Sequence, residues 1–384
     1  MRKRAFAYGL AAAFALLGGA GSALLGVCGP FTDVSDPAFC PFVLEIFTLG
    51  ITTGTTPTTY DPTSTVNRLQ MAAFLSRTVD GVLKRGSRRA ALDQFWTTQN
   101  STVLGLTTVG TTPQFVTSDG ADLWVGNFGG ASVSRVRGSD GALLETWTGA
   151  PNASGVLVAM GRVFVTGRQS PGQLYRIDPS AAPGAVDIVA SNLGNNPVGI
   201  AFDGARIWTG NLGNSVSIVT PGATIPWTVT TVSAGFGIPL GALFDGANIW
   251  IADASAQAIL KLDPAGVILQ TVTVGSAPQY PVFDGSNIWV PNSGGTSVSV
   301  VRASTGAVLA TLTGNGLNQP EAAAFDGQRV LVTNNGTSSV SVWKAADLTA
   351  IGTFSTGPGK IPFAACGDGI HFWIALSTGQ LARF

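Results

Sequence analysis

The stretch FDGANIWIAD at residues 244–253 is the clearest guide to the fold, because the chain repeats it. It returns as FDGARIWTGN at 202–211 and as FDGSNIWVPN at 283–292. Asp-Gly pairs mark the repeats at intervals of 39 or 42 residues, and one interval of 84 residues contains a degenerate copy, VAMGRVFVTG at 158–167. This internal repetition predicts seven copies of one structural unit with a period near 42 residues.

Two residue types occupy fixed positions in most of these copies. A tryptophan follows the aspartate by five residues, and an asparagine or aspartate follows it by eight. Because a residue present in nearly every copy is first explained by the copy itself, we interpret the aspartates as turn residues and the tryptophans as packing residues between units. The aspartates are Asp119, Asp203, Asp245, Asp284, Asp326 and Asp368, and the tryptophans are Trp124, Trp208, Trp250, Trp289 and Trp373.

The asparagine series leaves two interpretations open. These amides either cap strand ends toward a central channel or line a polar binding surface there. The series comprises Asn127, Asn211, Asn292 and Asn334, with Asp253 at the same position of one further copy.

Each copy is predicted to contain four strands. The Asp-Gly pair is typical of a tight turn, because glycine accepts a positive φ. The run that follows it, such as NIWIA, is apolar and β-branched, which indicates a strand buried on both faces. An alternating strand at 297–301 and a further strand at 307–313 complete one copy. Four strands in about 40 residues predict a blade of a β-propeller, so residues 102–384 are predicted to form a mainly β, seven-bladed propeller.

The last copy ends at Phe384, one strand short of a full blade. Residues 106–113, LTTVGTTP, are similar to TVTVGSAP at 271–278, which is the fourth strand and exit of an earlier copy. We therefore expect this N-terminal segment to be the outermost strand of the seventh blade and to close the ring. The copies resemble the YVTN/NHL-type propellers of bacterial surface and periplasmic proteins, which serve as scaffolds, as binders and occasionally as enzymes.

The first residues predict export. A basic segment at 2–4, an apolar segment at 5–17 and small residues at 21–23 are typical of a secretory signal peptide over residues 1–23. An uncleaved anchor is the alternative, because apolar residues continue to Val27. We expect the mature chain at the cell surface, in the periplasm or outside the cell, without a membrane span.

Three cysteines are present, Cys28, Cys40 and Cys366. Export permits disulfides, and the first two are close in sequence at the start of the first domain, so we predict that they pair. Cys366 lies in a predicted propeller strand, where a buried, inert thiol is the ordinary interpretation. Three cysteines and one histidine give no zinc-binding spacing, and we expect neither a metal nor a cofactor.

Residues 31–80 differ from the repeats and predict a small helical module. One helix is expected from Phe42 to Leu49, and a second from an N-cap at Thr65 to about Val79. FTDV at 31–34, Gly50-Ile51 and Tyr60-x-Pro62 follow in an order that resembles the surface-layer homology (SLH) module.

The SLH resemblance implies a binding site at the start of the second helix. The family's T-R-A-E motif, which binds cell-wall polysaccharide, aligns here with Asn67, Arg68, Leu69 and Gln70. The resemblance therefore implies that Asn67, Arg68 and Gln70 contact cell-wall polymer, while a spacer or an oligomerisation unit is the alternative. Residues 81–101 are predicted to be a basic linker to the propeller, and the cations at 84–89 could add affinity for an acidic polymer.

Residues suited to catalysis are scarce in the propeller. His371 is the only histidine of the chain, and Glu145 and Glu321 are the only glutamates of the propeller. None of the three has a catalytic partner by sequence, so no catalytic residue is predicted. A formal net charge of zero with 11 % charged residues argues against nucleic-acid binding.

Two functions of different classes follow. The first is a non-enzymatic envelope protein, in which the SLH-like module attaches to polysaccharide and the propeller binds a protein, glycan or peptide. The second is an enzyme, because propellers of this kind also resemble streptogramin lyases. That resemblance implies a metal-assisted elimination with a catalytic histidine, for which only His371 is available. We expect the first.

Overall fold

The computed structural model of the chain describes residues 28, 30–36, 38–48, 51–75, 78 and 105–384. The chain divides into two compact units, residues 1–98 and 99–384, and each is described by itself. The predicted signal peptide and the predicted basic linker lie outside the described residues. Among the helices that are described, none combines the length and the apolar character needed to cross a membrane.

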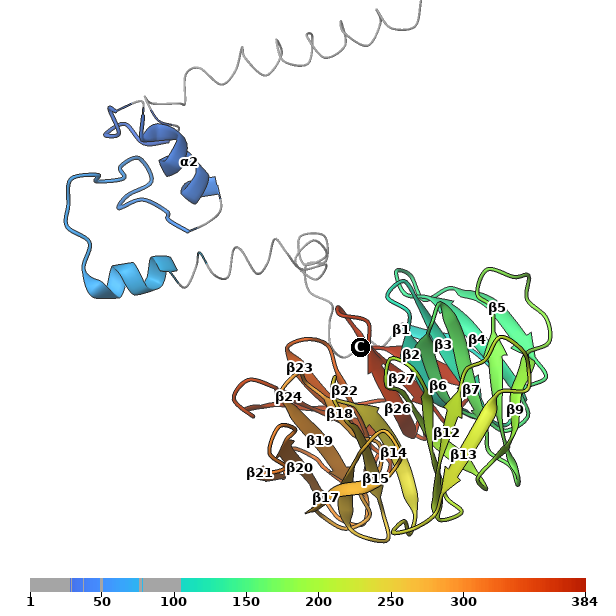
Figure 1. Ribbon diagram of the computed structural model, residues 1–384. Helices are drawn as coiled ribbons and strands as arrows, with labels where there is room; N and C mark the ends of the chain where they lie inside the picture. Colours follow the sequence, from blue (N-terminus) through green and yellow to red (C-terminus); the bar gives the residue numbers. More distant parts are fainter. Residues whose placement is uncertain (1–27, 29, 37, 49–50, 76–77, 79–104) are drawn as a thin grey trace, which may run out of the picture. The chain divides into compact units, whose positions relative to one another are not determined.

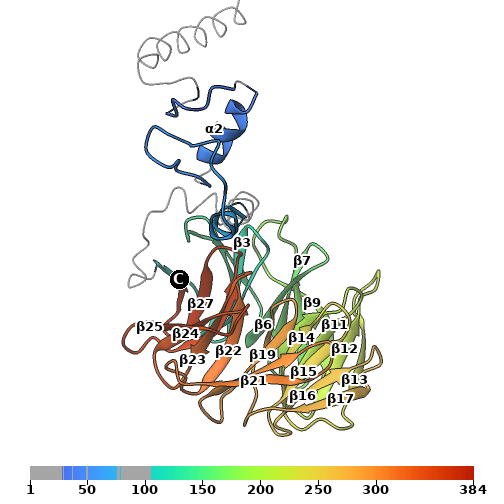
Figure 2. The same cartoon turned by 90° about the vertical axis from the view of Figure 1, so that its left-hand side faces the viewer.

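Residues 105–384 form seven four-stranded antiparallel sheets, which are the blades of a propeller (Figures 1 and 2). Blade one consists of β2 (Pro113–Ser118), β3 (Asp122–Asn127), β4 (Ser132–Arg137) and β5 (Leu143–Thr148). Blade two consists of β6 (Ala153–Ala159), β7 (Arg162–Gly167), β8 (Gly172–Ile177) and β9 (Asp187–Leu193). Blade three consists of β10 (Pro197–Phe202), β11 (Ile207–Asn211), β12 (Ser215–Thr220) and β13 (Thr228–Val232). Blade four consists of β14 (Pro239–Phe244), β15 (Ile249–Asp253), β16 (Ala258–Leu262) and β17 (Ile268–Thr273). Blade five consists of β18 (Val282–Phe283), β19 (Asn287–Asn292), β20 (Ser297–Arg302) and β21 (Val308–Thr313). Blade six consists of β22 (Pro320–Phe325), β23 (Arg329–Asn334), β24 (Ser339–Lys344) and β25 (Ala350–Ser355).

Blade seven joins the two ends of the propeller unit. It consists of β26 (Pro362–Gly367), β27 (Phe372–Leu376), β28 (Gln380–Arg383) and, at its outer edge, β1 (Gly105–Thr108). β1 pairs antiparallel with β28, with Gly105 opposite Arg383 and Thr108 opposite Gln380, so the C-terminus lies next to β1 (Figure 1). Because β1 occupies this edge, β28 does not present unpaired backbone groups there.

Each inner strand contacts the inner strand of the next blade, and β26 contacts β2. The apolar core is divided into seven clusters, each of which lies between two neighbouring blades. The second strands, such as β15, are buried along their whole length because they face a neighbouring blade on both sides. The repeated tryptophans lie in these clusters. Trp250, for example, is fully buried against Ile288 and Val290 of the next blade.

The N-terminal unit has a small core of its own. The helix α2 (Cys40–Thr48) packs Val43 beside Phe31, whose ring also contacts Phe47 and Tyr60 at centroid distances of 5.1 and 5.6 Å. A disulfide joins Cys28 to Cys40, which is the pairing predicted from the sequence.

The carboxylate of Asp33 connects the opening of this unit to its loop. It accepts hydrogen bonds from the backbone N–H groups of Tyr60 and Asp61, at 2.7 to 3.1 Å. These bonds, that of Tyr60 first, hold the pKa of Asp33 below its ordinary value. FTDV and the Tyr60 loop are therefore parts of one local structure.

The second helix does not begin where the sequence analysis placed it. Residues 68–75 are helical, and Asn67 is the N-cap in place of Thr65. The Asn67 side chain accepts a hydrogen bond from the Gln70 N–H, and the Gln70 side chain accepts one from the Asn67 N–H, both at 2.9 Å. This reciprocal capping box satisfies two backbone donors, whereas Thr65 has no partner three residues later that could return the bond.

Candidate functional site

The repeated aspartate organises the turn between the first and second strands of a blade. In blade four, Asp245 Oδ1 accepts from the N–H groups of Ala247 and Asn248, at 2.8 and 2.6 Å. Its Oδ2 accepts from Trp250 Nε1 at 2.7 Å. Burial alone would raise the pKa of Asp245, but these hydrogen bonds outweigh it and lower the pKa. Gly246 adopts a φ of +95° with open space around its α-carbon, so the glycine is required by the backbone conformation.

The aspartate and the tryptophan therefore depend on each other. In blade six, where Leu331 replaces the tryptophan, Asp326 Oδ2 accepts from Arg329 Nε at 2.7 Å. In blade two both partners are replaced, by Met160 and Phe164, so no indole N–H is left to satisfy. The other four pairs repeat the bond of blade four: Asp119–Trp124, Asp203–Trp208, Asp284–Trp289 and Asp368–Trp373.

The asparagine series forms a second internal network. Asn127 is fully buried, and its Nδ2 donates to the hydroxyls of Ser132 and Ser134, at 3.2 and 2.9 Å. Its Oδ1 accepts from the N–H of Gly110, in the segment that enters the blade. This geometry supports the capping interpretation, because both polar atoms of the Asn127 amide are bonded within the protein. The same pattern joins Asn211 to Ser215 and Ser217, Asn292 to Ser297 and Ser299, and Asn334 to Ser339 and Ser341.

Two of the residues considered for catalysis belong to the framework. His371 Nδ1 lies 3.6 Å from Asp368 Oδ2, and the imidazole lies edge-on to Trp373. Despite burial, the neighbouring His371 and Trp373 help to lower the pKa of Asp368 to about 2. Glu145 does have a partner, which the sequence analysis missed. It lies opposite Arg135 on the adjacent strand and forms an ion pair with it at 3.4 Å.

The Cys366 thiol and the possible metal ligands of the propeller lie among the described residues. Burial raises the pKa of the Cys366 thiol, which fits an inert side chain. Within the described part of the chain, no three His, Cys, Asp or Glu side chains come together in a way that could hold a metal ion.

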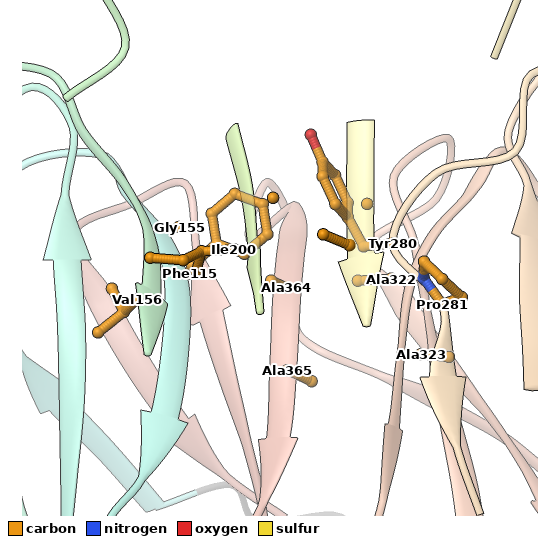
Figure 3. Close-up of a pocket in the computed structure, with 13 residues that line it drawn as sticks. Phe115, Gly155, Val156, Ile200, Tyr280, Pro281, Ala322, Ala323, Ala364 and Ala365 are labelled. Carbon is orange, nitrogen blue, oxygen red and sulfur yellow. The ribbon is translucent and has the colours of Figure 1, made fainter. Parts of the chain in front are cut away.

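The central channel offers a different kind of site. The inner strands of most blades begin with a proline at one end of the ring, the proline end, and finish at the Asp-Gly turns, the Asp-Gly end. Three aromatic side chains meet in the channel near the proline end. The rings of Phe115 and Tyr280 are 4.7 Å apart at 88°, and Phe363 lies 5.6 and 6.1 Å from them. Figure 3 shows the Phe115 and Tyr280 rings projecting between the inner strands.

The strand that follows Tyr280 is interrupted by a proline. Pro281 has no N–H, so β18 pairs with β19 only at Val282 and Phe283. Tyr280 bonds instead to the next blade: its N–H donates to the Glu321 carbonyl, and its carbonyl accepts from the Ala323 N–H.

A cavity of about 140 Å³ is lined by Phe115 and Tyr280, by glycines and alanines, and by Val156, Ile200 and Pro281 (Figure 3). Gly155, Gly199 and Gly241 line it from blades two to four. A Cβ on Gly155 would lie 2.1 Å from the Val198 carbonyl oxygen, and the other two glycines are confined in the same way. The glycines therefore permit close contact between neighbouring inner strands, and the larger rings fill the opposite side of the channel.

Glu321 gives this region an ionisable group. Burial raises the pKa of its carboxyl to about 7, and the carboxyl forms neither an ion pair nor a hydrogen bond with another described residue. Burial and the nearby charge of Glu321 raise the pKa of Tyr280, while the charge of Arg168 acts in the opposite direction. Arg168 lies 5.8 Å above the Phe128 ring. A carboxyl with a pKa near neutrality, beside aromatic rings, is typical of a functional site.

This channel site was missed in the sequence analysis, although the sequence contains a signal for it. Blades three and four carry Pro-x-Gly at the start of the inner strand. Blades one and five carry Pro-Gln-Phe at 113–115 and Pro-Gln-Tyr at 278–280. These two exceptions supply two of the three rings that meet in the channel, and the third, Phe363, directly follows Pro362 in blade seven.

The polymer-binding residues implied by the SLH resemblance lie together at the start of the helix at 68–75. Asn67, Arg68 and Gln70 are exposed. The capping box occupies one side-chain oxygen of Asn67 and one of Gln70, so their amide N–H groups and the Arg68 guanidinium are the groups that face solvent. Polymer binding at these residues stays a prediction.

Comparisons with known proteins support the propeller fold. No family model matches the chain, and no curated protein matches it, so the SLH and YVTN/NHL resemblances stay predictions. Virginiamycin B lyase from Staphylococcus aureus is similar in structure, with a TM-score of 0.61, 17 % identity, and coverage of 73 % of this chain and 99 % of the lyase.

Two further solved structures are similar to the same degree. A streptogramin B lyase has a TM-score of 0.62, 15 % identity, and coverage of 73 % and 97 % of the two chains. The WD40 propeller domain of Doa1 has a TM-score of 0.60, 14 % identity, and coverage of 74 % and 97 %. Because lyases and a WD40 domain match equally well at such low identity, these comparisons define the chain as a β-propeller protein and establish no activity.

Proposed function

We propose that this chain is a non-enzymatic binding protein whose propeller binds a small ligand or the end of a peptide at the proline end of its channel. The observation that carries the proposal is a cavity lined by Phe115 and Tyr280, with Phe363 packed against both rings and the ionisable Glu321 close to Tyr280. Aromatic rings and one carboxyl fix and orient a ligand. His371 is at the Asp-Gly end, so it cannot act with Glu321 on one bound molecule.

We further propose that the protein is exported and is attached to the cell envelope by its N-terminal unit. The segment at 1–23 and the SLH-like order of motifs at 31–80 support this. The exposed guanidinium of Arg68 suits a carboxylate of cell-wall polymer, because it can donate two parallel hydrogen bonds.

Sedimentation with purified cell-wall sacculi tests the attachment. The mature full chain is expected to sediment, and Arg68→Ala is expected to stay in solution. Arg137→Ala, an arginine of the propeller, is the matched control and should sediment as the unchanged chain does. If Arg68→Ala also sediments, the attachment does not use this residue, and if the unchanged chain stays in solution, the attachment proposal is wrong.

A thermal-shift screen tests ligand binding in the channel. We would use a panel of amino acids, dipeptides and monosaccharides, and compare the full chain with Glu321→Gln. A compound bound at this site should raise the Tm of the unchanged chain and have a smaller effect on the variant. If every compound that raises the Tm does so equally in the unchanged chain and in Glu321→Gln, these compounds do not bind at the channel site and the proposal is wrong.

The second candidate function is an elimination of the streptogramin-lyase type, which is favoured only by the structural similarity. It can be tested with quinupristin, the compound bound to a catalytically inactive virginiamycin B lyase in one similar structure. We expect no conversion of quinupristin by liquid chromatography, which separates the substrate from an isomeric elimination product. Turnover that is abolished in His371→Ala would instead support the lyase.

A further inference from the structure

A groove at the Asp-Gly end of the ring lies at the opposite end from the channel site. It consists of two neighbouring cavities, of about 680 Å³ between blades five and six and about 420 Å³ between blades four and five. Both cavities are lined by Ser286 and Arg302, so Arg302 stands where they join. We call these two cavities together the interblade groove.

Cations line the interblade groove. Arg329 and Lys344 line the larger cavity with Arg302, and Lys261 lines the smaller one. Two aspartates also line it, but both are committed to their turns. Asp284 accepts hydrogen bonds from two backbone N–H groups, from Asn287 Nδ2 and from Trp289, and Asp245 accepts the bonds described above.

Comparison with blade one shows that Arg302 lacks the acid that its position ordinarily has. The equivalent arginine of blade one, Arg137, ends the third strand in the same way and forms an ion pair with Asp140 at 2.9 Å. In the aligned turns, RGSDGA at 137–142 and RASTGA at 302–307, Thr305 replaces that aspartate.

The residue opposite Arg302 on the neighbouring strand is also neutral. Asp122 lies opposite Arg137 in blade one, whereas Asn287 lies opposite Arg302 in blade five. Both positions are therefore neutral in blade five, although only Asp140 pairs with the arginine in blade one, since Asp122 pairs with Arg135. Among the described residues, Arg302 forms neither an ion pair nor a side-chain hydrogen bond.

From this arrangement we infer that the interblade groove binds an acidic polysaccharide, with Arg302 holding a carboxylate or phosphate group of the polymer. A guanidinium donates two parallel hydrogen bonds to either group. Ser286, Ser304 and Gln328 supply polar groups for sugar hydroxyls, and Phe325 supplies an apolar wall for the face of a sugar ring. The two connected cavities give room for more than one sugar unit, which favours a polymer over a single ion.

Isothermal titration of the full chain tests this inference. The probes are oligogalacturonate, which carries carboxylates, a glycerol-phosphate oligomer, and a neutral galactan oligomer of matched length. At least one acidic probe should bind, with an affinity that falls as salt is raised, and the neutral probe should not. Binding of oligogalacturonate indicates a carboxylate ligand, and binding of the glycerol-phosphate oligomer indicates a phosphate ligand.

Three variants assign the binding to the groove. Arg302→Ala should weaken binding of the acidic probe at least tenfold. Thr305→Asp, which restores the acid of blade one, should weaken it similarly while the guanidinium is retained. Arg137→Ala is the control and should bind as the unchanged chain does.

Defined results would overturn the inference. Binding that is equal in Arg302→Ala and the unchanged chain would exclude the groove, and failure of both acidic probes would exclude the ligand class. If polyglutamate binds as tightly as the acidic glycans and with the same dependence on Arg302, the groove recognises acidic chains in general and the assignment to polysaccharide is wrong. Because the groove and the channel site share no residue, either proposal can fail without the other.

Discussion

Replacing Asp245 with alanine should destabilise the propeller by about 3 kcal/mol, because one carboxylate accepts three N–H groups, one of which is the indole N–H of the buried Trp250. The indole of Trp250 is fully buried, so its N–H would lose its only partner and could not bond to water. A hydrogen bond to a charged group contributes about 1.5–3 kcal/mol, and an unsatisfied buried donor costs about as much. For a domain of this size, about 3 kcal/mol corresponds to a fall in Tm of about 6 °C.

A double-mutant cycle measures the contribution of the Asp245–Trp250 bond separately. Trp250→Phe removes the donor and keeps most of the ring, so it should cost less than Asp245→Ala. The two changes together should cost clearly less than their sum, because each removes the same bond. Urea unfolding followed by circular dichroism gives the three free energies. Additive costs, or a loss below about 1 kcal/mol in Asp245→Ala, would refute the argument that this bond stabilises the blade.

The same pair predicts the direction of a pH effect. The folded state lowers the pKa of Asp245, so its stabilising contribution is present above the ordinary aspartate pKa and is lost as the pH falls below about 4. The difference in Tm between Asp245→Ala and the unchanged chain should therefore shrink on acidification. A difference that stays constant down to pH 3 would contradict the assignment.

Three further predictions concern Glu321, two glycines and the disulfide. Because burial raises the pKa of Glu321 to about 7, the unchanged chain should lose stability as the pH rises from about 4.5 through 7, whereas the Tm of Glu321→Gln should change less over that range. Gly155→Ala should lower the free energy of unfolding, measured in urea, by about 3 kcal/mol, because its Cβ would lie 2.1 Å from the Val198 carbonyl oxygen. Gly204→Ala is the control and should lower it by about 1 kcal/mol, because Gly204 has a φ of +94° but open space around it. Reducing the disulfide of the N-terminal unit should lower the stability of that unit by about 3 kcal/mol and leave the calorimetric transition of the propeller unchanged.

The fold could be predicted from the sequence because the information for one blade is local and is repeated. Asp245, Gly246 and Trp250 lie within six residues, and their spacing predicts both the turn and the burial of the strand that follows it. The bond between the aspartate and the indole was not foreseen, although the paired loss of both residues in blade two was visible. Their dependence on each other is chemical and can be recognised from residue types alone.

The channel site could not be predicted in the same way, because its residues come from distant blades. Phe115, Tyr280 and Phe363 come from blades one, five and seven, and they meet only when the ring is closed. The partner of Glu145 likewise depends on the register of two strands. The N-cap error was of another kind, since the Asn67-x-x-Gln70 pattern was present in the sequence and was passed over in favour of Thr65.

In a repeat protein, departures from the repeat divide into two kinds, and the difference indicates where function lies. Leu331 in blade six departs from the tryptophan, but Arg329 takes over the bond to Asp326, so this departure is compensated within the blade. Arg302 and Glu321 are charged groups whose blades supply no partner for them. The Arg302 guanidinium has no partner to lose, and the buried Glu321 carboxyl destabilises the fold when it is charged, so we expect Arg302→Ala and Glu321→Gln to alter ligand binding without a loss of stability at neutral pH. Replacing Arg329, in contrast, should lower stability because the buried Asp326 carboxylate loses the guanidinium that pairs with it.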